Sequence, residues 1–181
     1  MERYVVDVGA HDGLWLSNSH LFLQLGFHAL LVEPKEDTFQ LLLDNVGVYR
    51  ESGNATVVNV AVGPEPNWLM MKSAGWWDGT EAYVTEFLCH SMQRGCVRVV
   101  PIDQLFRQHR VPRFPFLLSI DTEQNGSFMT GYMQALHDAN YFPLYLILEN
   151  VADRFDRLKA LGYTHLQEFR YDSVFRLSIT L

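Results

Sequence analysis

Acidic residues lie at or near the ends of four of the apolar runs that read as buried β-strands. These acids are Asp7, Glu33, Asp121 and Glu149. In open sheets of parallel strands, ligands bind at the carboxyl ends of the strands. Because a sheet has no structural need for carboxylates at this edge, the acids are predicted to hold a ligand or to move a proton.

The loop after the first of these runs has the pattern Asp7-x-Gly9-x-x-x-Gly13. A dinucleotide-binding loop would read G-x-G-x-x-G, and its middle glycine is absent here. An acid two residues before the first glycine would also repel a pyrophosphate, whereas it suits a ligand with an ammonium group. The loop therefore favours a ligand without phosphate.

Glu33 ends the second apolar run, about 20 residues after the loop, where dinucleotide-binding folds carry the acid that binds the ribose hydroxyls. A ligand with an amino acid end and a ribose but no phosphate is S-adenosylmethionine. The loop and Glu33 together predict this cofactor. A nicotinamide-dependent oxidoreductase is the alternative that the missing glycine disfavours.

Apolar runs alternate with amphipathic segments, which predicts an α/β fold with a mostly parallel sheet and helices on both faces. The predicted strands are residues 4–8, 27–32, 55–62, 116–120 and 144–148, with a final antiparallel strand at 175–181. The predicted helices are residues 17–25, 35–46, 101–108, 127–139 and 151–158.

The segment from residue 67 to residue 94 has the least regular pattern. Residues 68–71 are compatible with a strand that pairs with residues 97–100. The stretch between them is compatible with partial helix. Its aromatic side chains suit either core packing or a wall of a binding site; they are Trp76, Trp77, Tyr83 and Phe87.

The composition is that of one globular domain over residues 1–181, with 48% hydrophobic residues and a net charge of −7. This charge disfavours a nucleic acid partner, because phosphate contacts need cationic side chains. No apolar run is long enough to span a membrane. Cys89 and Cys96 form no metal motif and are expected to be free thiols, which predicts a cytoplasmic protein. The oligomeric state is left open.

Several segments resemble the FkbM-type methyltransferase family, and the resemblance covers nearly the whole chain. The most specific of them are Val6-Asp7-Val8-Gly9-Ala10-His11-Asp12-Gly13 and Leu31-Val32-Glu33-Pro34. Weaker ones are Ser17-Asn18, Asn59-Val60-Ala61-Val62-Gly63, Val100-Pro101-Ile102-Asp103-Gln104-Leu105 and Leu118-Ser119-Ile120-Asp121-Thr122-Glu123.

The resemblance implies a Rossmann-like, seven-stranded methyltransferase fold and O-methylation of a sugar or another small molecule that carries a hydroxyl. It implies that Asp7, Gly9 and Gly13 line the methionine end of the cofactor and that Glu33 holds the ribose. It further implies that Ala61 and Val62 lie near the adenine and that Asp121 faces the reaction centre. The predicted cofactor-binding residues are Asp7, Gly9, Ala10, His11, Asp12, Gly13, Glu33, Pro34, Ala61, Val62 and Asp121.

A hydroxyl acceptor needs a base to take its proton. The candidates are Asp121, Glu123 and His11, in that order, although His11 also suits a plain loop residue beside the ligand. A metal ion is the less favoured means of lowering the hydroxyl pKa. Its oxygen ligands would be Asp121, Glu123 and Glu149.

The family usually reads D-x-E-G-x-E after the fourth strand, whereas this chain reads Asp121-Thr122-Glu123-Gln124-Asn125-Gly126. The glycine and the second acid of the pattern are absent. The chain also begins directly at the first strand, without the segment that covers the acceptor in longer relatives. These departures favour one alternative, a binding module that keeps the cofactor fold without catalysis.

Overall fold

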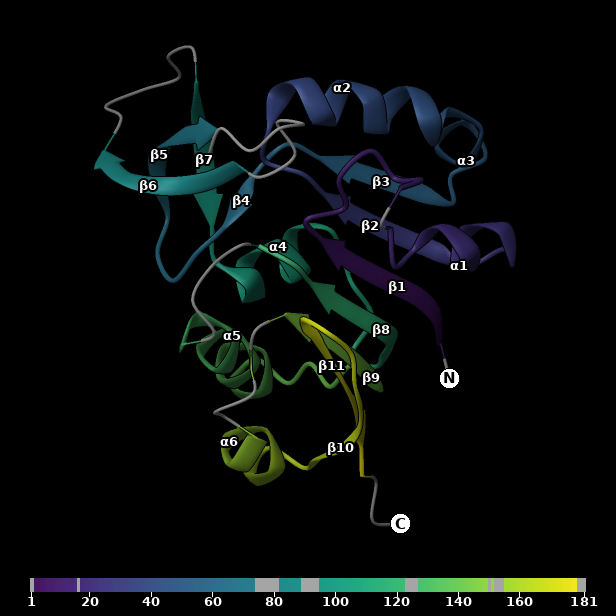
Figure 1. Cartoon of the computed structure of the whole chain (residues 1–181). Helices are drawn as coiled ribbons and strands as arrows, with labels where there is room; N and C mark the ends of the chain where they lie inside the picture. The colour runs from purple at the N-terminus through teal and green to yellow at the C-terminus, as the bar shows by residue number, and fades with distance from the viewer. Residues whose placement is uncertain are drawn as a thin grey trace.

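Strand β1 (Glu2–Val8) lies in the interior of the main sheet in the computed structural model (Figure 1). The structure describes residues 2–15, 17–73, 82–88, 95–122, 127–149, 151 and 155–178. Three of the four last residues of β1 are apolar and buried, and the fourth is Asp7. A strand without a polar face is typical of the interior of a sheet that is covered on both sides.

The main sheet has seven strands in the order β10-β11-β9-β8-β1-β2-β3. Its other strands are β2 (His28–Val32), β3 (Ala55–Val58), β8 (Pro115–Ile120), β9 (Tyr145–Glu149), β10 (Tyr163–Glu168) and β11 (Asp172–Leu177). Neighbours from β3 to β9 pair in parallel, whereas β11 is antiparallel to both β9 and β10. The predicted mostly parallel sheet with an antiparallel last strand is confirmed.

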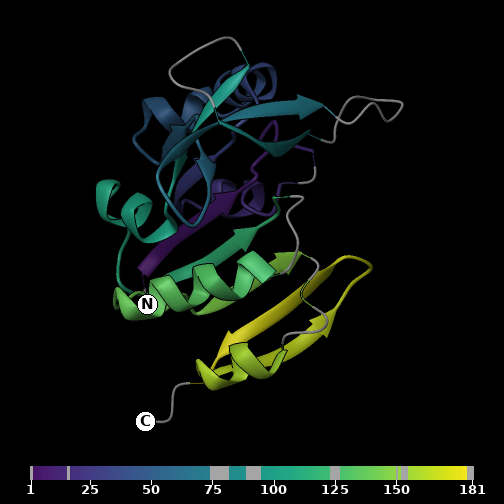
Figure 2. The same ribbon diagram turned by 90° about the vertical axis from the view of Figure 1, so that its left-hand side faces the viewer.

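Helices cover both faces of this sheet, as predicted (Figures 1 and 2). Side chains of α1 (His20–Gln24), α2 (Glu36–Asn45) and α3 (Gly47–Glu51) pack on one face, against Val5 and Leu31. Side chains of α4 (Ile102–Gln108), α5 (Ser127–Asp138) and α6 (Phe155–Ala160) pack on the other face, against Val6 and Leu30. Because successive residues of a strand point to opposite faces, β1 and β2 contribute to both cores.

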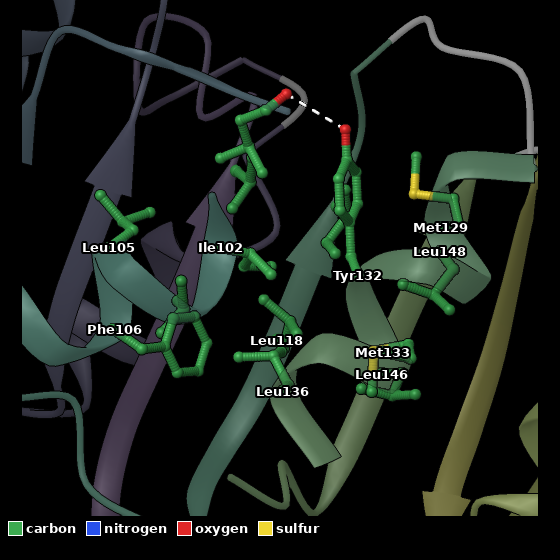
Figure 3. Close-up of a cluster of buried hydrophobic side chains, with 14 of the residues drawn as sticks. Ile102, Leu105, Phe106, Leu118, Met129, Tyr132, Met133, Leu136, Leu146 and Leu148 are labelled. Carbon is green, nitrogen blue, oxygen red and sulfur yellow. Dashed lines mark hydrogen bonds between the residues drawn. The ribbon is translucent and has the colours of Figure 1, made fainter. Parts of the chain in front are cut away.

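The larger core lies between the sheet and helices α4 and α5 (Figure 3). Phe106 of α4 and Leu136 of α5 are fully buried there, opposite Leu118 of β8. The hydroxyl of Tyr132 donates a hydrogen bond of 3.1 Å to the carbonyl oxygen of Val62. This bond connects α5 to the segment that leaves the main sheet after β3.

A second sheet follows β3 and has four strands in the order β4-β7-β5-β6. They are β4 (Ala61–Val62), β5 (Asn67–Ser73), β6 (Ala82–Leu88) and β7 (Cys96–Val100). Strands β5 and β7 pair as predicted from residues 68–71 and 97–100. The partial helix expected between them is wrong at residues 82–88, because this segment pairs with β5 instead.

The predicted single strand over residues 55–62 is divided between the two sheets. The side-chain amide of Asn59 donates to the carbonyl oxygens of Glu33 and Pro34, at 3.0 and 3.2 Å. These bonds hold the chain at the end of β2, and it then leaves the main sheet to pair with β7. A side chain that binds the backbone of a neighbouring segment thus separates β3 from β4.

Three further sequence predictions need correction. Helix 17–25 is shorter, because Ser17 and Ser19 turn their hydroxyls toward Asp7 ahead of α1. Strand β10 was not predicted, since four of its six residues are polar, but it pairs with β11. Strand β11 begins at Asp172, earlier than expected, because it pairs with β9 from Glu149 onward.

Cys96 is disulfide-bonded, so the expectation of a free thiol is wrong at this position. Leu69 of β5 pairs with Leu88 on one side and with Val97 on the other, which brings the end of β6 near the start of β7. Cys89 lies outside the described residues. The disulfide removes the support that free thiols gave to a cytoplasmic location. No helix in the described part of the chain is long and apolar enough to cross a membrane.

The end of β1 contacts the end of β8 through backbone atoms. The N–H of Asp121 donates to the carbonyl oxygen of Val8 at 2.9 Å. Gly9 has a φ of +86°, and a Cβ atom on it would lie 1.8 Å from the carbonyl oxygen of Asp121. Glycine is therefore required at position 9 both by conformation and by space.

We predict that Gly9→Ala lowers the free energy of unfolding by at least about 2 kcal/mol, because it adds a backbone clash to an unfavourable φ. Gly131→Ala is the matched control: a Cβ on this residue of α5 meets no atom within 4 Å. The control should raise stability by about 0.5–1 kcal/mol, as alanine does in helices. Urea unfolding measures both variants, and equal stabilities would contradict the close approach of Gly9 to Asp121.

Candidate functional site

The strand register brings the predicted acids to one edge of the main sheet. Val8 pairs with Val32 and with Ile120, and Ile120 pairs with Leu148. The residues that follow these strand ends, Glu33 and Asp121, therefore lie side by side with the loop after β1. Glu149 belongs to the same edge, where it pairs with Asp172.

The loop after β1 uses its backbone N–H groups within the chain. Those of Gly9 and Ala10 donate to the carbonyl oxygen of Val32, at 2.9 and 3.0 Å, and that of Gly13 donates to Ala10. Those of residues 11, 14 and 15 donate to carboxylates of the site. A phosphate-binding loop points its N–H groups at the ligand instead. The N–H groups of residues 9, 10, 11, 13, 14 and 15 are thus used within the protein.

The carboxylate of Glu33 joins two loops. Its Oε2 accepts the N–H of His11 at 3.1 Å, and its Oε1 accepts the N–H of Lys35 at 2.8 Å. The residue is only 7% exposed. Burial raises the pKa of Glu33 to about 7, although these hydrogen bonds oppose the shift. Each oxygen accepts one of these bonds, and a carboxylate has about four accepting positions, so Glu33 retains capacity for ligand hydroxyls.

Asp7 is buried at the end of β1, with 2% of its surface exposed. Its Oδ2 accepts hydrogen bonds from the hydroxyls of Ser19, at 2.6 Å, and Ser17, at 3.4 Å. Burial raises the pKa of Asp7 to about 6, with a further increase from the charge of Asp121 and opposition from the serines. Asp7 is thus a buried acid that two serine hydroxyls hold at the end of β1.

Asp121 is partly exposed at the centre of the edge. Its negative charge contributes to the raised pKa of Asp7, Glu33 and Asp172, after the larger effect of burial in each case. Several carboxylates therefore act on one another across the end of the sheet. A cationic ligand relieves such repulsion, whereas an anionic one increases it.

His11, Asp12 and Ala10 shape the loop. His11 has a φ of +51°, and its Nδ1 lies 3.6 Å from Oδ1 of Asp12. That Oδ1 accepts the N–H groups of Leu14 and Trp15; burial would raise the pKa of Asp12, but these bonds and His11 hold it below its ordinary value. Ala10 is fully buried in the core beneath.

The two loop glycines are explained by contacts within the protein. Gly9 approaches the backbone of Asp121, as described above. A Cβ on Gly13 would lie 2.5 Å from Leu42 and 2.9 Å from Val46. Both glycines thus let the loop pack closely against β8 and α2, which was not the reason expected from the sequence.

The two residues predicted to lie near the adenine directly follow a pair of cavity-lining residues in the sequence. Ala61 and Val62 are buried in strand β4. Their predecessors Asn59 and Val60 line a cavity of about 650 Å³, together with Pro34 and residues of the second sheet. This cavity begins directly beyond Glu33.

The remaining predicted residues lie partly outside the described structure. Outside the described residues lie Glu123, the segment from Gln124 to Gly126, Trp76 and Trp77. Tyr83 and Phe87 belong to strand β6. Glu149 is mostly buried at the end of β9. Within the described residues, no group of three or more His, Cys, Asp or Glu side chains is arranged to hold a metal ion.

Four polar residues of the site escaped the sequence analysis as site residues. Ser17 and Ser19 bind Asp7, Asn59 binds the backbone after β2, and Asn18 donates to Ser119 of β8 at 3.0 Å. The available signal was the group of small polar residues at 17–19, directly after an acidic loop. Its partners became evident only in the fold.

Comparison with protein families finds that the model of the methyltransferase FkbM domain matches residues 7–126, which is more than half of the chain. The match includes the loop after β1, the cavity residues and the end of β8. A search of curated proteins finds no match.

Solved methyltransferase structures share the fold. The methyltransferase FkbM from Methylobacillus flagellatus has a TM-score of 0.56 and 17% identity, and the alignment covers 97% of this chain but 43% of that one. The METTL16 methyltransferase domain has a TM-score of 0.58 and 14% identity over 98% of this chain and 60% of that chain. A putative methylase from Haemophilus influenzae has a TM-score of 0.54 and 11% identity, and the alignment covers 98% of this chain and 81% of that chain. The chain thus spans less than half the length of the first of these proteins.

We predict that the stability of the free protein falls as the pH rises from about 5 to 8. A carboxyl group whose pKa is raised in the folded state stabilises the fold below its unfolded pKa, near 4, and this contribution is lost as the pH passes the folded pKa. For Asp7 and Glu33 the folded values are about 6 and about 7. For Glu33 the loss is on the order of 2 kcal/mol.

Urea unfolding at pH 5 and pH 8 measures this loss. Glu33→Gln should show a smaller difference between the two pH values than the wild type. Glu51→Gln, which removes an exposed carboxylate of α3, should keep the wild-type difference. An unchanged pH dependence in Glu33→Gln would show that Glu33 does not titrate in this range.

Proposed function

Because the chain belongs to the FkbM methyltransferase family, we propose that it methylates a hydroxyl group of a sugar or another small molecule. S-adenosylmethionine is the methyl donor of this family, and when bound it supplies a methyl group made electrophilic by a positively charged sulfur. The observation that carries the proposal is the acidic carboxyl edge of the main sheet, where Glu33 and Asp121 flank a loop whose backbone N–H groups mostly donate within the protein.

The residues of this edge fit the donor in charge and in hydrogen bonding. Glu33 accepts the ribose hydroxyls, for which its two oxygens retain accepting positions. Asp7 is buried below the loop, so its charge, rather than direct contact, favours the amino group of the methionine end. Ser17 and Ser19 keep that charge in place through their hydroxyls.

Asp121 acts on the acceptor. It is partly exposed at the edge, so a hydroxyl that enters the site has access to its carboxylate. With the donor bound, the acceptor oxygen would gain the methyl carbon as the carbon–sulfur bond of the donor breaks, and the proton of the acceptor would pass to the carboxylate of Asp121. The protein mainly has to align the acceptor with the donor, which a rigid sheet edge does well.

The acidic edge and the net charge of −7 support an acceptor that is small and not anionic. Phosphate-rich acceptors would be repelled by Asp7, Glu33 and Asp121 together. A hydroxyl of a neutral sugar or natural product satisfies this condition. We propose such a molecule as the acceptor.

We predict that S-adenosylmethionine and S-adenosylhomocysteine raise the melting temperature and that NAD does not. A ligand that binds only the folded state adds about 2.7 kcal/mol of stability at a hundredfold excess over its dissociation constant. Thermal unfolding with each compound tests this expectation. Stabilisation by NAD, or by neither adenosyl compound, would contradict the assigned donor.

We predict that Asp121→Asn stays folded and lowers methyl transfer roughly a hundredfold or more, the usual scale for a positioned acid–base group. Hydroxylated sugars are first screened for the production of S-adenosylhomocysteine. Substitution of a base lowers the rate of methyl transfer alone, whereas substitution of a residue that orients the donor lowers donor affinity and rate together. Asp44→Asn, an exposed acid of α2, is the control and should keep the wild-type rate.

Two outcomes would redirect the proposal. If Asp121→Asn transfers methyl groups at the wild-type rate, the role of the base passes to Glu123 or His11. Tight donor binding without product in a broad screen would favour the binding module over the enzyme.

A further inference from the structure

A cavity of about 650 Å³ lies between the ends of β2 and β3 and the second sheet. On the side of the main sheet it is lined by Pro34, Asn59 and Val60, and on the side of the second sheet by Trp68 and Met71. Figure 1 shows the second sheet beside the start of α2, beyond the end of β3. A cavity of this size suits a nucleoside-sized group.

The cavity continues from Glu33. Pro34 follows Glu33 directly, and the N–H of Lys35, which also lines the cavity, binds Oε1 of Glu33 at 2.8 Å. A ribose on the Glu33 carboxylate therefore has the cavity within reach of its attached base. This step rests on the proposed function, in which Glu33 holds the ribose.

Asn59 lines this cavity and keeps a hydrogen-bond acceptor. Its Nδ2 donates to the carbonyl oxygens of Glu33 and Pro34, at 3.0 and 3.2 Å, which uses both of its hydrogens. The group that remains for a ligand is therefore Oδ1, a hydrogen-bond acceptor. Its complement on a base is an amino group, such as the exocyclic amine of adenine.

Trp68 supplies the opposite wall. It is half-buried in β5, where its neighbour across the strand pair is Arg98. An indole ring offers a flat apolar surface on which a nucleobase stacks. Met71 adds a flexible thioether, which makes favourable contacts with aromatic rings. The second sheet thus brings to the cavity what the main sheet lacks there, an aromatic wall.

We propose that Trp68 stacks on the adenine of the methyl donor, and that Trp68 with Asn59 determines the base that the site accepts. The second sheet thereby belongs to the donor site. Trp68 is a residue that touches the cofactor, and its contribution is to binding and to base selectivity.

Titration calorimetry with S-adenosylhomocysteine tests the stacking. Trp68→Ala should weaken binding about tenfold or more, which corresponds to about 1.4 kcal/mol. Trp68→Phe keeps a ring and should lose less than about threefold. Phe114→Ala is the control, an aromatic truncation at the amino-terminal end of β8, and should bind as the wild type does. Binding by folded Trp68→Ala within about twofold of the wild type would overturn the role of Trp68.

Fluorescence gives a readout independent of affinity. The ligand should change the tryptophan emission of the wild type, because a stacked base quenches the indole. Trp68→Phe retains Trp15, Trp76 and Trp77, and most of this change should disappear in it. A change of undiminished size in Trp68→Phe would also overturn the stacking.

A ligand exchange tests the base without altering the protein. S-inosylhomocysteine has a carbonyl oxygen where S-adenosylhomocysteine has the amine, so it faces Oδ1 of Asn59 with a second acceptor. The wild type should bind it at least about tenfold more weakly. Equal affinities would overturn the base assignment while leaving the donor assignment intact. Failure of S-adenosylhomocysteine to bind the wild type at all would overturn both.

Discussion

The carboxylate of Glu33 connects the two loops that form the carboxyl edge of the main sheet. One oxygen binds the N–H of His11 and the other binds the N–H of Lys35. The backbone of the same residue accepts the amide of Asn59, which directs the chain out of the main sheet. The first loop and the start of α2 therefore depend on the side chain of one buried acid, and the departure toward the second sheet begins at the backbone of the same residue.

This arrangement sets a conflict between stability and binding. Burial makes the ionised forms of Glu33 and Asp7 costly, which is why both pKa values are raised. Asp121 adds its own charge to the same edge. A donor with positive charge and ribose hydroxyls would relieve this cost, so the buried acids would favour the proposed ligand.

The second sheet lies beside the carboxyl edge of the main sheet. Its four strands come from the segment between β3 and α4. The hydroxyl of Tyr132 fixes its first strand to α5. Hydrogen bonds at Asn59 and at Val62 thus hold the start of the second sheet beside the main sheet. They explain how a cavity wall that is distant in sequence lies near Glu33.

The amino-acid sequence by itself determined the α/β class, most of the main strands along the chain and the positions of Asp7, Glu33 and Asp121 near strand ends. These features follow from local periodicity and from short spacings, which are visible in any continuous segment. Local patterns did not show that the strand is interrupted at Asn59 or that the second sheet forms a wall of the cavity. They also did not show that Ser17 and Ser19 donate hydrogen bonds to Asp7.

Only the tertiary structure decided these features, because each depends on partners that the chain brings together from a distance. Asn18 meets Ser119 across 101 residues, and Gly9 is a glycine because the carbonyl oxygen of Asp121 occupies the space of its Cβ. The partner of a side chain across the sheet produces no periodic pattern in the sequence. The positions of the uncharged polar residues of the site were therefore decided by long-range packing, while those of its acids could be predicted from the strand ends.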